Sequence, residues 1–288
     1  MTSPEISPLR YPGGKGHLAP FFGSLLAAQV LPTKVFVEPF AGGAGAALTL
    51  LAQGKAESVV LNDLDAGVAA LWRSIFGQSE DFARMIETTP VTIEAWWKHH
   101  AIYLARQDNH DDLALGFATF FLNRTNRSGI LDAWPIGGLA QAGDWKIDCR
   151  FNRETLAARV RRLGALRGRV TVTQKDAIAL IPDYMAPSSF IYADPPYLTK
   201  GADLYLNAMT WEDHRALSDA LAGSRGMWMV TYDHDERVSD LYPRFRRAEF
   251  ALAHAAGKSH VGKEYAVFAD RLKIASLDGL GRDGAFVG

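Results

Sequence analysis

Residues 34–45, which read KVFVEPFAGGAG, carry the pattern that decides the fold. The stretch 34–38 has the apolar, β-branched composition of a short strand, and the glycines after it predict a tight turn into a helix over 46–53. Glycine lets the backbone approach a bulky ligand, and a helix amino terminus favours negative charge beside it. We therefore expect a strand–turn–helix unit that can hold a cofactor, although a glycine-rich turn without a ligand has the same pattern.

The next apolar run, 58–61, supports this interpretation. It runs into Asn62-Asp63, and an acid at a strand end about 20 residues beyond a glycine turn can bind the hydroxyls of a ribose. The third glycine of the dinucleotide fingerprint is missing, because Leu48 stands at that position. The glycine loop therefore fits any nucleoside cofactor.

The order of the remaining elements predicts an α/β fold. Further apolar runs end at Val172, Ala193 and Thr231, with helical patterns between most of them, and this alternation is typical of a parallel sheet with right-handed crossovers. The last two runs, 246–252 and 264–269, are close enough in sequence to form an antiparallel hairpin at one edge.

The interval 67–165 breaks the alternation, since it is helical or irregular throughout. We expect it to form a helical insertion in a catalytic domain made of residues 1–66 and 166–275. The glycine-rich tail, 276–288, is expected to be flexible.

A second motif, Asp194-Pro195-Pro196-Tyr197, closes the apolar run 189–193. The exocyclic amine of a nucleobase is a poor nucleophile, because its lone pair is delocalised into the ring, and acceptors aimed at its protons draw that pair back. Asp194 offers a carboxylate, Pro195 offers a backbone carbonyl, and the two prolines stiffen the loop. Tyr197 offers a flat face on which a base can stack. Taken alone, the same residues could be an ordinary loop after a buried strand.

The amino-terminal stretch 9–15, LRYPGGK, completes the pattern. In combination the segments resemble the Dam-like, D12 class family of adenine-specific DNA N6-methyltransferases. The matching parts are Tyr11 through Lys15, Phe36 through Gly45, Asp63, and Asp194 through Tyr197, in the order of the group whose lysine motif precedes the glycine loop.

The resemblance implies a class I S-adenosylmethionine-dependent methyltransferase fold, which is Rossmann-like with a seven-stranded, mostly parallel sheet. The cofactor it implies is S-adenosyl-L-methionine. Lys15 would pair with the cofactor's carboxylate and Tyr11 would pack beside it. Asp63 would bind the ribose, and Glu38 would reach the methionine end. Asp176 would lie near the cofactor's adenine, although an aspartate that caps a helix explains this position equally well.

The family resemblance also implies a site-specific reaction on double-stranded DNA. The target adenine must leave the duplex, because N6 is paired and its ring is stacked. That adenine would stack on Tyr197 and present N6 to Asp194 and Pro195, and Asp194 also borders the cofactor. Ser259-His260, together with residues 263–265 (KEY), resembles a late motif of the family that faces the target base.

The insertion would then be the target-recognition region. Within it, the loop 123–129 offers Asn123, Arg124, Asn126 and Arg127 as candidate DNA contacts, since arginine can bind guanine and asparagine can bind adenine. The alternative is a polar connecting loop with capping roles. The segment 150–169 is rich in arginine, with Glu154 its single acid, and is a second candidate for contact with phosphates.

Bulk properties narrow the remaining possibilities. The 288 residues are 48% hydrophobic, which allows a large core, and the formal net charge of −1 does not mark a nucleic-acid binder. The single cysteine, Cys149, excludes an internal disulfide. We see no apolar run of about 20 residues, no signal peptide and no metal-ligand spacing among the histidines, and so expect a cytoplasmic protein without a metal. The family resemblance implies that it is a bacterial or phage-type enzyme.

Two other functions remain open at this stage. Cytosine N4 methylation needs the same acceptors, but the family usually has serine in place of the leading aspartate for cytosine, and Asp194 therefore favours adenine. A catalytically silent nucleic-acid-binding homologue would not require Lys15, Asp63, Asp194 and Tyr197 together. A dehydrogenase or a protein glutamine methyltransferase explains fewer of the motifs. The recognised DNA sequence and any pairing with a restriction enzyme cannot be read from these residues.

Overall fold

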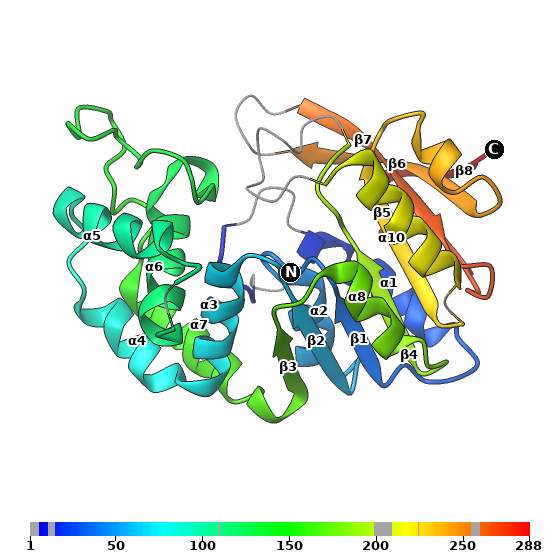
Figure 1. The fold of residues 1–288 in the computed structure, drawn as a ribbon, viewed down its shortest axis with the longest axis horizontal. Helices are drawn as coiled ribbons and strands as arrows, with labels where there is room; N and C mark the ends of the chain where they lie inside the picture. Colours follow the sequence, from blue (N-terminus) through cyan, green and yellow to red (C-terminus); the bar gives the residue numbers. More distant parts are fainter. Residues whose placement is uncertain (1–5, 11–14, 109, 199–208, 224, 255–259) are drawn as a thin grey trace.

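A computed structural model of the protein describes residues 6–10, 15–108, 110–198, 209–223, 225–254 and 260–288. Its centre is one eight-stranded sheet in the order β3-β2-β1-β4-β5-β7-β6-β8 (Figure 1). The parallel strands are β1 (Val35–Glu38), β2 (Ser58–Asn62), β3 (Val170–Thr173), β4 (Ser189–Ala193) and β5 (Met227–Asp233). The sequence prediction of these five strands and of their parallel arrangement is confirmed.

The antiparallel edge agrees with the sequence in one respect and differs in another. Strands β6 (Arg246–His254) and β7 (His260–Phe268) form the predicted hairpin, with β7 placed between β5 and β6. An eighth strand, β8 (Arg282–Val287), pairs antiparallel with the outer edge of β6. The expected seven-stranded sheet is therefore corrected to eight strands, and the segment expected to be a flexible tail contains one of them.

Glycine explains why this last strand is hidden in the sequence. Gly281 has a φ of +124°, and a Cβ built on it would lie 2.7 Å from a ring atom of Phe250 and 2.8 Å from the carbonyl oxygen of Ala251. Gly281, whose residue type argues against a strand in the sequence, is thus the residue that lets the tail approach β6 closely. Phe286 packs edge-on against Phe268, with ring centroids 6.3 Å apart.

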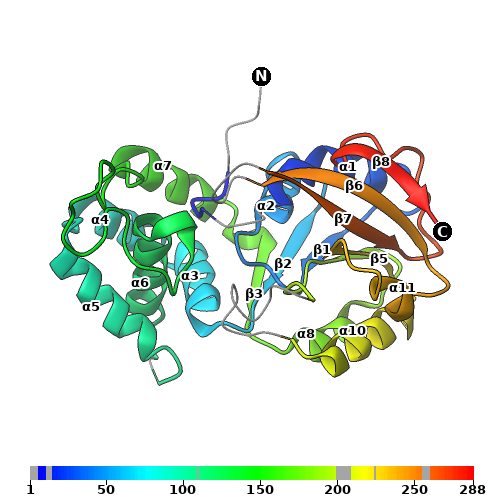
Figure 2. The same cartoon turned by 90° about the horizontal axis from the view of Figure 1, so that it is seen from above.

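Helices cover both faces of the sheet. Helices α1 (Ala19–Ala27) and α2 (Gly45–Ala52) lie on one face, and α8 (Ala177–Leu180), α10 (Trp211–Gly223) and α11 (Val238–Leu241) lie on the other (Figure 2). Short 3-10 helices complete the described part of this region: η1 (Lys15–Leu18), η3 (Arg167–Arg169) and η4 (Ile181–Tyr184). The helix predicted over 46–53 is α2, shifted by one residue.

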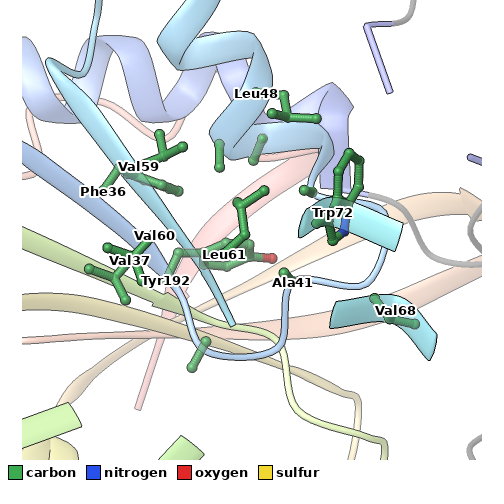
Figure 3. Packing of buried hydrophobic residues seen from close by; sticks show 14 of the residues in the cluster. Phe36, Val37, Ala41, Leu48, Val59, Val60, Leu61, Val68, Trp72 and Tyr192 are labelled. Atoms are coloured by element: carbon green, nitrogen blue, oxygen red, sulfur yellow. The ribbon is translucent and has the colours of Figure 1, made fainter. Parts of the chain in front are cut away.

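The core lies between the sheet and these helices. Figure 3 shows apolar side chains of β1, β2 and α2, with Trp72 and Tyr192, packed around the glycine-rich turn. On the face covered by α1, the ring of Phe22 lies 5.4 Å from Phe36, 5.9 Å from Phe190 and 4.6 Å from Tyr192, measured between centroids. This packing holds β1 and β4 together against α1, and so positions the residues that follow these two strands.

Between β2 and β3 the chain runs through five helices that extend to one side of the sheet (Figure 1). They are α3 (Ala66–Gly77), α4 (Ser79–Thr88), α5 (Ile93–Leu104), α6 (Asp112–Thr125) and α7 (Arg153–Gly164), with η2 (Arg127–Gly129) after α6. Helices α3 and α6 approach closely at Gly116, where a Cβ would lie 2.7 Å from the carbonyl oxygen of Ala70. The apolar residues of these helices belong to the same continuous core as the sheet. The division into a catalytic domain and a separate insertion therefore stays a prediction.

Candidate active site

A cavity of about 510 Å³ lies at the carboxyl ends of the parallel strands, a size usual for small-molecule sites. It brings together five residues predicted from the sequence: Lys15, Glu38, Asp63, Asp176 and Asp194. The glycine-rich turn, the loop 129–132 of the helical region and Met209 also line it. Tyr11, the sixth predicted cofactor residue, lies outside the described residues.

The glycine-rich turn forms one wall of this cavity. Gly42 (φ +44°) and Ala44 (φ +49°) have left-handed backbone conformations, and the indole nitrogen of Trp72 donates to the carbonyl oxygen of Gly42 at 2.9 Å. A Cβ on Gly45 would lie 3.0 Å from the backbone of Gly16. This close approach packs η1 against the start of α2 and carries Lys15 to the cavity wall.

Asp63 is held at the turn by backbone donors. Its Oδ2 accepts from the amide of Gly42 at 2.9 Å, and its Oδ1 accepts from the amide of Asp65 at 3.0 Å. Burial, together with the neighbouring charge of Asp65, raises the pKa of Asp63 to about 7. Each carboxylate oxygen can accept a second hydrogen bond, so the side chain can bind a diol from the cavity side.

Glu38 is a buried acid at the end of β1. Its side chain is 4% exposed, and Oε1 accepts from the amide of Ala47, in the first turn of α2, at 2.9 Å. Burial raises the pKa of Glu38 to about 8, and the nearby charge of Asp194 acts in the same direction. Since no described cation forms an ion pair with it, Glu38 is suited to receive a positively charged group that enters the cavity.

Asp194 follows β4 and is the centre of a polar cluster. Its Oδ1 accepts from the hydroxyl of Thr231 at 2.6 Å and lies 3.3 Å from Nζ of Lys15. Nζ of Lys15 also lies 2.8 Å from Oε2 of Glu264. The side chains of Lys15 and Glu264 are 5% and 1% exposed, so this is a buried ion-pair cluster.

The protonation of the cluster follows from its charges. Burial alone would lower the pKa of Lys15, but the carboxylates of Asp194 and Glu264 outweigh burial and hold it well above its usual value. Burial raises the pKa of Glu264, while Lys15 acts against the rise. Lys15 is therefore a permanent cation bound to two protein carboxylates, and its expected contact with a cofactor carboxylate stays a proposal.

The other members of the tetrapeptide lie around Asp194. Pro195 is buried, whereas Pro196 is partly exposed and lines the cavity. Tyr197 is partly exposed, and its hydroxyl donates to Oε1 of Glu264 at 3.4 Å. The backbone acceptor role of Pro195 and the stacking role of Tyr197 remain proposals.

Asp176 has an observed structural role. Its Oδ1 accepts from the amides of Ile178 and Ala179 at 2.8 and 3.1 Å, and it thereby caps the amino terminus of α8. Since Asp176 also lines the cavity, a contact with the cofactor is compatible with the cap.

Two of the candidate DNA contacts are buried. Asn123 is 1% exposed, and its amide bonds the backbone N–H and carbonyl of Arg10 at 2.8 and 2.9 Å and the carbonyl of Gly129 at 2.8 Å. Asn126 is 0% exposed, and it accepts from the indole of Trp96 at 2.7 Å. The prediction that Asn123 and Asn126 contact DNA does not fit this geometry, because both amides are used inside the protein.

The segment 123–129, expected to be a loop, is the end of α6 followed by η2, and its two arginines differ from each other. Arg124 donates to the carbonyl of Arg150 at 2.9 Å and to that of Pro8 at 3.5 Å, so it joins separate segments of the chain. Arg127 is exposed. It is the candidate of the four whose side chain remains open to a DNA partner.

The arginine-rich segment 150–169 is used largely within the protein. Arg159 donates to the carbonyl of Ser7 at 2.7 Å, Arg161 pairs with Glu80 and Glu87, and Arg169 donates to the carbonyl of Glu57. Arg150, Arg162 and Arg167 have exposed side chains. The predicted phosphate-binding face is therefore narrower than its sequence indicates.

Sequence reasoning missed several polar residues of the site. Asn62, fully buried, donates to the carbonyls of Pro39 and Lys175 and accepts from Thr173, and so ties together the ends of three strands. Its only sequence signal is its position before Asp63. Thr231 lies on β5, 37 residues beyond Asp194 in the chain. Its contact with Asp194 depends on the register between β4 and β5, which the sequence does not reveal.

Among the described residues, no group of three or more His, Cys, Asp or Glu side chains could hold a metal ion. None of the described helices combines the length and the apolar character needed to cross a membrane.

The chain is similar to known proteins at the level of a family. The family model described as D12 class N6 adenine-specific DNA methyltransferase matches residues 11–252. No curated protein matches the chain. Two solved structures resemble it weakly. The rRNA methyltransferase AviRa from Streptomyces viridochromogenes has 14% identity over 96% of this chain and 90% of its own, with a TM-score of 0.35. Protein LPL1258 from Legionella pneumophila has 12% identity over 88% and 83%, with a TM-score of 0.31. With TM-scores this low, neither structure is used to infer the fold or the function of this chain.

Proposed function

The chain belongs to the D12 class N6 adenine-specific DNA methyltransferases, and we propose that it acts on an adenine rotated out of double-stranded DNA into the cavity beside Asp194. An enzyme of this family transfers a methyl group from S-adenosylmethionine to N6 of adenine in DNA. The observation that carries the proposal is the position of Asp194, which lines the same cavity as the glycine-rich turn, Asp63 and Glu38.

The cavity residues fit the cofactor. The left-handed turn at Gly42 and Ala44 leaves backbone beside the cavity, and Asp63 there can bind a ribose diol. The cofactor supplies an electrophilic methyl on a positively charged sulfur. Glu38, a buried acid whose pKa is about 8, supports binding of a cationic end, because an entering positive charge stabilises its carboxylate. Asp176 would border the adenine of the cofactor, and Lys15 and Tyr11 would lie towards its methionine part.

Asp194 supplies an acceptor for the target amine. Hydrogen bonds from N6 to Asp194 and to the carbonyl of Pro195 would localise the nitrogen lone pair, and Tyr197 would support the base by stacking. An ordinary carboxylate is a weak base towards an amine, so its contribution is orientation and charge stabilisation while the proton leaves after methyl transfer.

The five helices between β2 and β3 supply the surface for target recognition in this proposal. The loop 129–132 of this region lines the cavity, so the helical region and the methyl-transfer site share a wall. Exposed Arg127 lies two residues before this loop and would contact DNA there. The enzyme would act on nucleoid DNA of a bacterium or of a phage-infected cell.

Base rotation can be tested with a fluorescent adenine analogue. The methylated position is first mapped by sequencing DNA that the enzyme has modified, and 2-aminopurine then replaces the target adenine in a short duplex. Enzyme binding should raise the fluorescence of that duplex and leave a duplex labelled two positions away unchanged, because stacking quenches the probe and only the target leaves the stack. Equal fluorescence from both duplexes, with the unlabelled duplex methylated normally, would contradict base rotation.

A further inference from the structure

Thr231 has a buried hydroxyl beside the carboxylate of Asp194. It belongs to β5 and is 0% exposed, and its neighbour Val230 pairs with Ala193 in the parallel register of β4 and β5. Asp194 follows Ala193, so the register sets Thr231 next to it. The two side chains meet at 2.6 Å, a short hydrogen bond to a carboxylate.

The direction of these hydrogen bonds follows from proton counting. A threonine hydroxyl has one proton, and here it goes to Oδ1 of Asp194. The hydroxyl of Tyr192 lies 3.0 Å from Oγ1 of Thr231, and so it must donate to that oxygen. Tyr192 is 2% exposed, and burial, with the charge of Asp194, raises its pKa well above the usual value, which keeps this donor protonated.

The second partner of Asp194 reaches the same oxygen. Nζ of Lys15 lies 3.3 Å from Oδ1, and it also lies 2.8 Å from Oε2 of Glu264. Both protein contacts of the Asp194 carboxylate thus fall on Oδ1. Within the part of the chain that the structure describes, Oδ2 receives no hydrogen bond or ion pair.

We propose that Thr231, supported by Tyr192, is a positioning residue that holds Oδ1 of Asp194 and leaves Oδ2 to accept from the amine of the target adenine. This inference rests on the proposed function of Asp194. A carboxylate can rotate about its Cβ–Cγ bond, and a free one would offer either oxygen in many orientations. A fixed acceptor avoids that reorganisation when charge develops in the transition state. Lys15 attracts the same oxygen electrostatically, while the hydroxyl of Thr231 fixes the orientation of the carboxylate.

The test compares Thr231→Val, which keeps the shape and removes the hydroxyl, with Thr231→Ser, which keeps the hydroxyl. The single-turnover rate of N6-methyladenine formation is measured at saturating DNA and cofactor, and the dissociation constant of S-adenosylmethionine is measured separately. We expect the valine variant to lose about tenfold to hundredfold in rate, with the cofactor constant within about threefold of wild type. The serine variant should recover most of the rate. Tyr192→Phe should lose less than Thr231→Val, since it removes only the donor behind the hydroxyl.

The matched control is Thr119→Val in α6. Thr119 is also buried, at 1% exposure, but its hydroxyl donates to the carbonyl of Leu115 in its own helix at 2.9 Å. This variant should methylate at the wild-type rate. A wild-type rate for Thr231→Val, or an equal loss for the valine and serine variants, would overturn the inference. Failure of the wild-type enzyme to form N6-methyladenine would instead refute the proposed function, so the two failures are distinguishable.

Discussion

At the scale of single residues, the cavity contains two acids whose pKa values are raised. Glu38 has a pKa of about 8 and Asp63 a pKa of about 7, mainly because burial removes the water that would stabilise their charges. At neutral pH Glu38 is mostly protonated in the free protein. Glu38 is therefore a protonated acid that can ionise when a cation binds beside it.

Glu38 should release a proton when the cofactor binds. A group with a pKa of about 8 is roughly nine-tenths protonated at pH 7, and an adjacent positive charge lowers that pKa. Calorimetric titration at pH 7 in two buffers of different ionisation enthalpy should show proton release for the wild type. Above about pH 9 the release should disappear, because Glu38 is already ionised before binding. Glu38→Gln should show less release at pH 7, and equal release by both proteins would contradict this role.

At the scale of elements, residues 6–10 are bound by the helical region, a few residues before the chain reaches Lys15 in the cavity lining. Asn123 of α6 bonds both backbone groups of Arg10, and Arg159 of α7 bonds the carbonyl of Ser7. Gly129 has a φ of +77°, and the carbonyl of Arg10 occupies the space where its Cβ would stand. Lys15, five residues further along the chain, then enters the cavity. The end of α6 and η2 after it thus have a structural role.

Asn123 and Arg127 should respond to mutation in opposite ways. Asn123→Ala removes the hydrogen bonds that its amide makes to the backbone of Arg10 and to the carbonyl of Gly129, and should lower the free energy of unfolding by about 2–4 kcal/mol. Arg127→Ala changes an exposed side chain, and should alter stability by less than about 0.5 kcal/mol while weakening DNA binding and its salt dependence. Chemical denaturation and DNA titration at several salt concentrations measure both effects. A stable Asn123→Ala variant that has lost DNA affinity would reverse this interpretation.

The sequence predicted the elements well where the signal is local. The strands ending near Glu38, Leu61 and Ala193 are strong apolar runs, and their shared carboxyl edge predicts that the residues after them lie close together. Strand β8 has no such signal, because its residues include Arg282, Asp283 and Gly284, and it forms only by pairing with β6. The contacts of Thr231 with Asp194 and of Glu264 with Lys15 were equally hidden. Thr231 and Glu264 depend on cross-strand register, and long-range register cannot be read from one sequence.

At the scale of the whole molecule, one continuous hydrophobic core joins the eight-stranded sheet to the helices α3 to α7. The cavity is lined by residues of both, including the glycine-rich turn and the loop 129–132. In the proposed function, this arrangement lets the surface that contacts DNA and the site that holds the methyl donor share one wall. Our central claim is that Asp194, at this meeting point, is the acceptor for the target amine.

Mass spectrometry of digested DNA tests that claim most directly. Unmethylated DNA is incubated with S-adenosylmethionine and either the wild-type enzyme, Asp194→Ala, or the control Asp278→Ala, whose parent residue is exposed and does not line the cavity. The wild type and the control should form N6-methyladenine. Asp194→Ala should form none, while its cofactor affinity stays within about threefold, since Lys15 keeps its ion pair with Glu264 and a lost transition-state interaction lowers rate without lowering binding. N6-methyladenine formed by Asp194→Ala at a rate near that of the wild type would contradict the account.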